Sequence, residues 1–153
     1  MYQDRTNGFN PEKFLSAQRG ETGYSSYDTA LAEIRSGNKV GHWIWYVFPQ
    51  LRGLGKTDLS WNYGITGIEE AREYLAHPVL GARLLEITEA LYQQEGRAID
   101  ILHSPDDKKV RSCMTLFLLA SPETEIFQKV LDKFYKGRKD DLTLSLLNLS
   151  VTE

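Results

Sequence analysis

Residues 104–120 read SPDDKKVRSCMTLFLLA and have the pattern of a helix that starts at the surface and ends in a core. A Ser, a Pro and two Asp residues stand at the start, where caps, prolines and acids are favoured. After Met114 the segment is almost wholly apolar as far as Ala120. An apolar run of this kind is typical of a buried helix, so we expect 104–120 to form a central helix.

Outward from this segment, the chain is punctuated by further helix starts and stops. Capping and stop residues separate stretches whose apolar residues recur at helical spacing. These residues are Asn10, Ser26, Gly37, Thr66, Gly96, Ser121 and Gly137. Thr66 and Glu69 have the spacing of a capping box. The length of 153 residues suits one domain. We expect residues 1–153 to form an all-α, compact single-domain bundle of about eight short-to-medium helices.

Residues 41–50 read GHWIWYVFPQ, and Gly53 and Gly55 follow them. The period of the apolar residues is ambiguous, but the helices expected on both sides favour a short helix over 42–48. In a helix, residue 45 points about 200° away from residue 43. If Trp43 faces the core, Trp45 therefore contacts a second surface. This cluster of rings is either core packing or one wall of a ligand pocket.

Composition and charge argue against several classes of protein. The net charge is −3 and the Lys and Arg residues are scattered, which argues against general nucleic-acid binding. No run of about 18 apolar residues is present, so we expect no membrane-spanning segment. The single cysteine, Cys113, forms no internal disulfide. With the lack of a signal-peptide pattern at the start of the sequence, it favours a cytoplasmic location.

The sequence predicts neither a cofactor nor a metal site. Phosphate-loop, dinucleotide-binding, zinc-protease and CxxC motifs are all missing from it. The three histidines, His42, His77 and His103, are far apart and lack the spacing of metal ligands.

Candidate ligand-binding residues fall in the aromatic segment and in the helix over 104–120. They are Trp43, Trp45, Gln50, Lys108, Arg111, Ser112 and Thr115. A Trp ring would stack on a flat ligand ring, and the guanidinium of Arg111 has the fork geometry that suits a phosphate or carboxylate. The polar side chains would orient the ligand. The alternatives are that the rings are core and that Arg111 pairs internally with an Asp one turn away.

Three residues are candidates for catalysis. Asp106 or Asp107 would be the acid or base, and His42 would assist it. Hydrolysis is favoured over redox chemistry because no cofactor motif is visible. Each residue also has a structural alternative: the two aspartates mark a helix start, and His42 caps the helix over 42–48.

Three groups of residues together carry a resemblance to a known family. They are His42-Trp43-Ile44-Trp45 with Phe48-Pro49-Gln50 and Gly53-Leu54-Gly55, Tyr74-Leu75 with His77-Pro78-Val79-Leu80-Gly81 and Arg83-Leu84, and Ser104-Pro105-Asp106-Asp107-Lys108 with Arg111-Ser112 and Met114-Thr115-Leu116-Phe117. From about residue 14 to 147 the chain resembles the bacterial domain of unknown function 1810 family, sometimes labelled calpastatin. That resemblance implies a compact, mainly helical domain and no established reaction. The calpastatin label carries no weight, since eukaryotic calpastatin is disordered whereas this sequence has the apolar helices of a folded domain.

A fainter likeness, from Arg111 to Phe117 and on to Phe127 and Leu131, is to the NADAR family. It implies a phosphorylated or nucleotide-like ligand, such as an ADP-ribose relative.

Two functions follow as hypotheses. The first is a site for a nucleotide-like or phosphorylated small molecule, with hydrolysis of an N-glycosidic bond as its possible chemistry. The second is a non-catalytic protein–protein interaction or adaptor module that uses an aromatic surface, because Trp, Tyr and Arg are enriched at interface centres. A concave pocket that joins residues 42–50 to 106–115 favours the first, and a flat aromatic patch favours the second.

Overall fold

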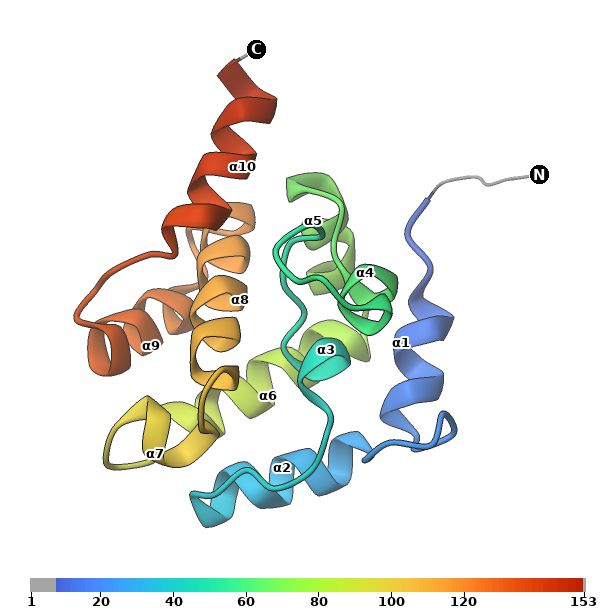
Figure 1. The fold of residues 1–153 in the computed structure, drawn as a ribbon, viewed down its shortest axis with the longest axis vertical. Coiled ribbons are helices and arrows are strands. Elements are labelled where there is room, and N and C mark those ends of the chain that lie inside the picture. The colour runs from blue at the N-terminus through green and yellow to red at the C-terminus, as the bar shows by residue number, and fades with distance from the viewer. Residues whose placement is uncertain (1–7, 153) are drawn as a thin grey trace.

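The computed structural model describes residues 8–152, with side chains up to Leu147, and over this range the chain is built from helices (Figure 1). The ten helices are α1 (Pro11–Gln18), α2 (Tyr27–Ser36), α3 (Ile44–Val47), α4 (Asp58–Tyr63), α5 (Ile68–Ala76), α6 (Leu80–Tyr92), α7 (Ala98–Leu102), α8 (Asp106–Ala120), α9 (Glu125–Tyr135) and α10 (Asp141–Thr152). In this range the sole β-type pairing is an isolated bridge between Leu51 and Ile65. The predicted all-α class is confirmed, and the short helix α4 is one that the sequence analysis did not predict.

The helix boundaries follow local chemistry. Ser26 caps α2 by accepting a hydrogen bond from the backbone N–H of Thr29 at 3.2 Å, and Gly37 ends that helix with a φ of 82°. The capping box predicted for Thr66 and Glu69 is not formed. Instead, the Thr66 N–H and hydroxyl both donate to Glu70, at 2.7 and 2.9 Å.

Helix α8 is the central helix, as predicted. It packs against α5, α7, α9 and α10, and nine of its residues are buried. Phe117 lies between the rings of Tyr74 on α5 and Phe127 on α9, with centroids 5.6 and 5.9 Å away. Because such a helix has neighbours on most sides, side chains that point in different directions from it contact different parts of the molecule. This arrangement separates the side chains at its polar start.

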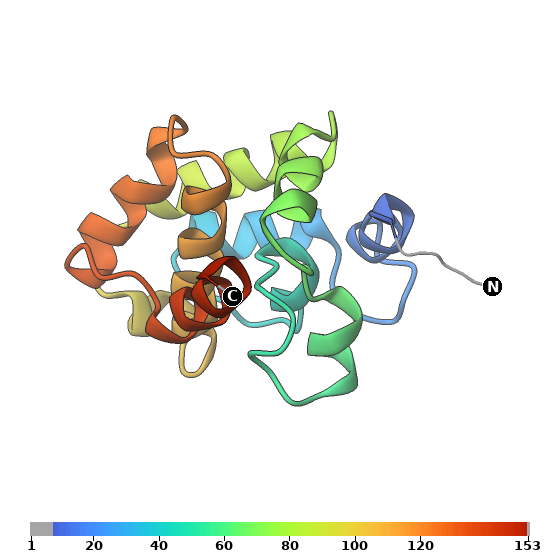
Figure 2. The ribbon, with the colours of Figure 1, turned by 90° about the horizontal axis from the view of Figure 1, so that it is seen from above.

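Helices α1, α3 and α4 lie on the side of the molecule away from α9 (Figure 2). Helix α2 packs on α6, and α1 packs on α3. Trp43, directly before the short α3, and Tyr46 within it are completely buried, whereas Trp45 is half-buried and has a different aromatic neighbour, Tyr24. The predicted divergence of residues 43 and 45 is therefore confirmed. Among the described residues, no helix has both the length and the apolar character needed to cross a lipid bilayer.

Candidate functional site

A hollow lies where the loop before α3 faces the start of α8. Its volume is about 310 Å³, and we call it the His42 hollow. Its lining includes Lys39, His42, Trp45, His103, Asp106 and Lys109. Three of them, His42, Trp45 and Asp106, are residues that the sequence analysis predicted for a site. The structure therefore joins the aromatic segment to the first turn of α8 in one concave surface.

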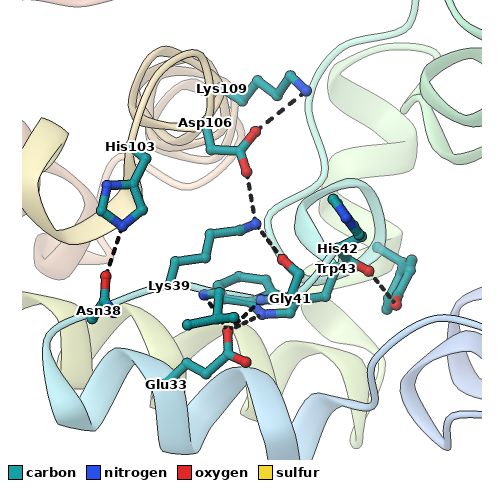
Figure 3. A network of polar contacts seen from close by, with 11 residues as sticks. Glu33, Asn38, Lys39, Gly41, His42, Trp43, His103, Asp106 and Lys109 are labelled. Atoms are coloured by element: carbon teal, nitrogen blue, oxygen red, sulfur yellow. Dashed lines mark hydrogen bonds and ion pairs between the residues drawn. The ribbon is translucent and has the colours of Figure 1, made fainter.

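Glu33 of α2 fixes the loop that forms one wall of this hollow (Figure 3). One oxygen, Oε1, accepts hydrogen bonds from the N–H groups of Val40 and Gly41 and from the indole Nε1 of Trp43, at 2.8, 2.9 and 2.8 Å. Burial by itself raises the pKa of the Glu33 carboxyl, but these donors and the charge of Lys39 outweigh it and lower the pKa below its usual value. The carboxylate thus holds the loop in place while it stays ionised.

Lys39 and Asp106 form a buried ion pair across the floor of the hollow. Lys39 Nζ is 2.7 Å from Asp106 Oδ2 and also donates to the Gly41 carbonyl at 2.6 Å. It lies 4.7 Å from the centre of the Trp43 ring, and the Lys39 side chain is only 7% exposed. Asp106 Oδ1 has a second cation, Lys109 Nζ, at 3.4 Å (Figure 3). Two lysines from different segments therefore hold this carboxylate.

The rim of the hollow is aromatic. The Trp45 ring meets Tyr24 edge-on at 6.0 Å, and Lys109 Nζ is 5.6 Å from the centre of the Trp45 ring. His42 is exposed at the rim. His103 Nε2 shares a hydrogen bond with Asn38 Oδ1 at 2.7 Å, and His103 has a φ of 68°, which residues with a Cβ rarely adopt.

The structure places the other predicted residues away from this hollow. Trp43 is buried behind its floor, and Lys108 is exposed on another side of α8. The backbone carbonyl of Gln50 accepts a hydrogen bond from Ile65 N–H at 2.9 Å, in the connection between α3 and α5. The Ser112 hydroxyl donates to the Lys108 carbonyl at 3.2 Å. The ligand-binding roles predicted for these residues stay predictions.

Asp107 and Arg111 lie on a side of α8 that faces α9. The Tyr135 hydroxyl donates to the Asp107 carbonyl at 2.6 Å, and the Arg111 guanidinium lies 5.9 Å from the centre of the Tyr135 ring. Burial raises the pKa of Tyr135, and the Asp107 carboxylate raises it further. Among the described residues, neither Asp106 nor Asp107 forms an ion pair with Arg111, so the internal pair considered as an alternative is not made.

Sequence analysis missed several residues of the hollow. Lys39 and Glu33 are separated from Asp106 by more than 65 residues and have no motif around them, so only the fold could pair them. Lys109 had a local signal, because residues three apart on a helix share a face. Cys113 is completely buried, and burial raises the pKa of its thiol, as expected of an unreactive structural cysteine. Within residues 8–147, no cluster of three or more metal-ligating side chains occurs.

A family model and a solved structure both match this chain. The model of a family described as "Protein of unknown function (DUF1810)" matches residues 8–147. The chain belongs to the DUF1810 family. Another protein similar to this DUF1810 chain is the conserved hypothetical protein Rv1873 from Mycobacterium tuberculosis, known from its crystal structure. The two sequences are 43% identical, and the match covers 91% of this chain and 96% of that one. The two structures superpose with a TM-score of 0.86. No curated protein matches the chain.

Proposed function

We propose that this DUF1810 protein binds a small nucleotide-like or phosphorylated molecule in the His42 hollow, with hydrolysis of an N-glycosidic bond as the candidate reaction. One observation carries the proposal: a Trp ring, two histidines, a carboxylate and two lysines from separate segments line one concave surface. Its volume of about 310 Å³ is at the small end of ligand pockets, which suits one ring with one charged group.

The ligand ring would lie against Trp45, whose ring is half-buried and therefore held in place. Lys109 is the cation best suited to an anionic group of the ligand. Its ammonium has a weak partner at 3.4 Å, whereas Lys39 is held by two oxygens at 2.6 and 2.7 Å. The positive φ at His103 supports the proposal, because strained backbone is concentrated at functional sites.

Asp106 and His42 are the candidate catalytic pair. In the proposed reaction, the Asp106 carboxylate accepts a proton from a water molecule while the oxygen of that water forms a bond to the anomeric carbon. The bond from that carbon to the leaving base breaks, and protonated His42 donates a proton to the base. Asp107 lies on another side of α8, with its carbonyl bonded to Tyr135, so Asp106 is the better of the two candidate acids or bases.

Thermal shift measurements test the binding proposal. A ligand that binds only the native state raises its apparent stability, so the panel contains nucleotides, NAD, ADP-ribose and sugar phosphates. We expect a saturable shift with at least one compound, lost in Trp45→Ala and kept in Trp61→Ala. Trp61 is the matched control because it is 60% exposed and lies outside the His42 hollow. No shift with any compound, or equal loss in both variants, would overturn the proposal.

The second candidate function is a protein-interaction surface, and the exposed Trp61 favours it. The Arg52 guanidinium lies 4.6 Å from the centre of the Trp61 ring and donates to the Trp61 carbonyl at 2.9 Å. Stacked Trp and Arg side chains are typical of the centres of interfaces. If this surface is used, Trp61→Ala abolishes partner binding and leaves ligand binding unchanged.

A further inference from the structure

A second hollow lies between α8 and the loop that leads into α10. Arg111 of α8 and Arg138 and Lys139 of the loop line it, together with Asp141 and Leu144 of α10, and its volume is about 370 Å³. We call it the Arg111 hollow. The loop brings two cations beside a third that comes from the central helix. Three positive groups and one carboxylate therefore surround a space large enough for a phosphate group and part of a small molecule.

In the described part of the chain, Arg111, Arg138 and Lys139 form no ion pair with a carboxylate, unlike Lys39 and Lys109 of the His42 hollow. Within the described range, no ion pair or side-chain hydrogen bond involves Arg138 or Lys139. The Arg111 guanidinium lies 5.9 Å from the centre of the Tyr135 ring, and its Nε is buried without a hydrogen-bond partner in the described part of the chain. An unpaired donor on a charged group is costly, so the buried Nε–H of Arg111 calls for an acceptor.

The loop is also fixed rather than loosely placed. The Thr115 hydroxyl donates to the Arg111 carbonyl at 2.8 Å and accepts from the Asp140 N–H at 2.9 Å. Asp140 in turn accepts hydrogen bonds from the N–H and hydroxyl of Thr143, at 2.9 and 2.7 Å, and so caps α10. Thr115 therefore holds residues 138–141 against the turn of α8 that carries Arg111.

We propose that the Arg111 hollow binds the phosphate group of a small phosphorylated molecule, at a site separate from the His42 hollow. The forks of Arg111 and Arg138 match phosphate oxygens, and Lys139 adds a third charge. The Asp141 carboxylate at the rim repels a continuous polyanion and accepts a hydrogen bond from a hydroxyl of the ligand. These features favour a compact phosphate ester over nucleic acid, which agrees with the net charge of −3.

Nuclear magnetic resonance gives a direct test, with inorganic phosphate and pyrophosphate as probes at constant ionic strength. We expect saturable shifts of the Arg111 Nε–H signal and of the backbone amides at the start of α10. In Arg138→Gln/Lys139→Gln the affinity for pyrophosphate should fall about tenfold or more, because two charge-assisted contacts are lost. The amide spectrum of the same sample reports whether this variant is folded.

The control variant is Lys56→Gln/Lys129→Gln, which removes the same charge from two exposed sites outside this hollow. Its pyrophosphate affinity should stay within about twofold of the wild type, as should that of Trp45→Ala. Shifts that sodium chloride reproduces, or equal weakening in both double variants, would overturn the proposal. Because Trp45→Ala tests only the His42 hollow, failure of one site leaves the other separately measurable.

Discussion

Helix α8 borders two hollows whose charges are arranged in opposite ways. At its start, both cations of the His42 hollow, Lys39 and Lys109, are paired with the Asp106 carboxylate. One and a half turns later, Arg111 faces Arg138 and Lys139, and none of the three has a carboxylate partner in the described part of the chain. The first arrangement contributes to the stability of the fold, whereas the second leaves unpaired positive charges at the surface.

This difference predicts that the charges of the two hollows contribute differently to the stability of the fold. A buried charge that loses its partner destabilises the protein, because its desolvation is no longer offset. An unpaired charge near the surface costs little to remove, and its removal mainly affects an anionic ligand. Substitutions in the two hollows should therefore have effects of different kinds.

The largest effect is expected for Asp106→Asn. It leaves the ammonium of Lys39, a side chain 7% exposed, without its carboxylate, so we expect a loss of about 2–3 kcal/mol in the free energy of unfolding. The matched variant Asp141→Asn in the Arg111 hollow should change it by less than about 0.5 kcal/mol, because Asp141 is exposed. Urea denaturation of both measures the difference, and equal losses would break the comparison.

Glu33→Gln should come next, with a loss of about 2 kcal/mol near pH 7, because three donors lose a charged acceptor. The Glu33 pKa is lowered in the folded state, so its contribution is complete above the unfolded pKa of about 4.3. The contribution is lost as the pH falls towards the lower folded pKa. Denaturation at about pH 7 and about pH 3 should show a larger wild-type advantage at the higher pH; an equal advantage at both would contradict the role of ionised Glu33.

Thr115→Val should cost about 1 kcal/mol, because the Asp140 N–H loses its acceptor, and should also weaken phosphate binding in the Arg111 hollow. Thr88→Val is the matched control. Both threonines are fully buried, but Thr88 Oγ1 has no hydrogen-bond partner in the described structure. Its replacement by Val should therefore be neutral or stabilising in thermal denaturation. The same loss in both variants would show that Thr115 does not act through the loop.

The smallest effect on stability is expected for Arg138→Gln/Lys139→Gln. Neither side chain has an ion-pair or hydrogen-bond partner to lose in the described part of the chain, so the free energy of unfolding should change by less than about 0.5 kcal/mol. Chemical denaturation checks this value beside the pyrophosphate titration. A loss of more than about 1 kcal/mol would mean that these cations stabilise the fold, contrary to the comparison.

Sequence alone determined the all-α class, the central position of α8 and the divergence of Trp43 and Trp45. These features depend on contacts between residues a few positions apart. Helix caps and the spacing of apolar residues predict such contacts directly. Local signals still failed where two acceptors competed, as at Thr66, which bonds to Glu70 rather than to Glu69.

Only the tertiary structure decided which charged groups meet. The pairing of Lys39 with Asp106, the role of Glu33 and the meeting of Arg111 with Arg138 and Lys139 all join segments that are distant in the chain. Sequence analysis placed Asp106 and Arg111 in one site because both lie in 104–120. Residues five apart on a helix point about 140° away from each other, so the packing around α8 sends them to different hollows.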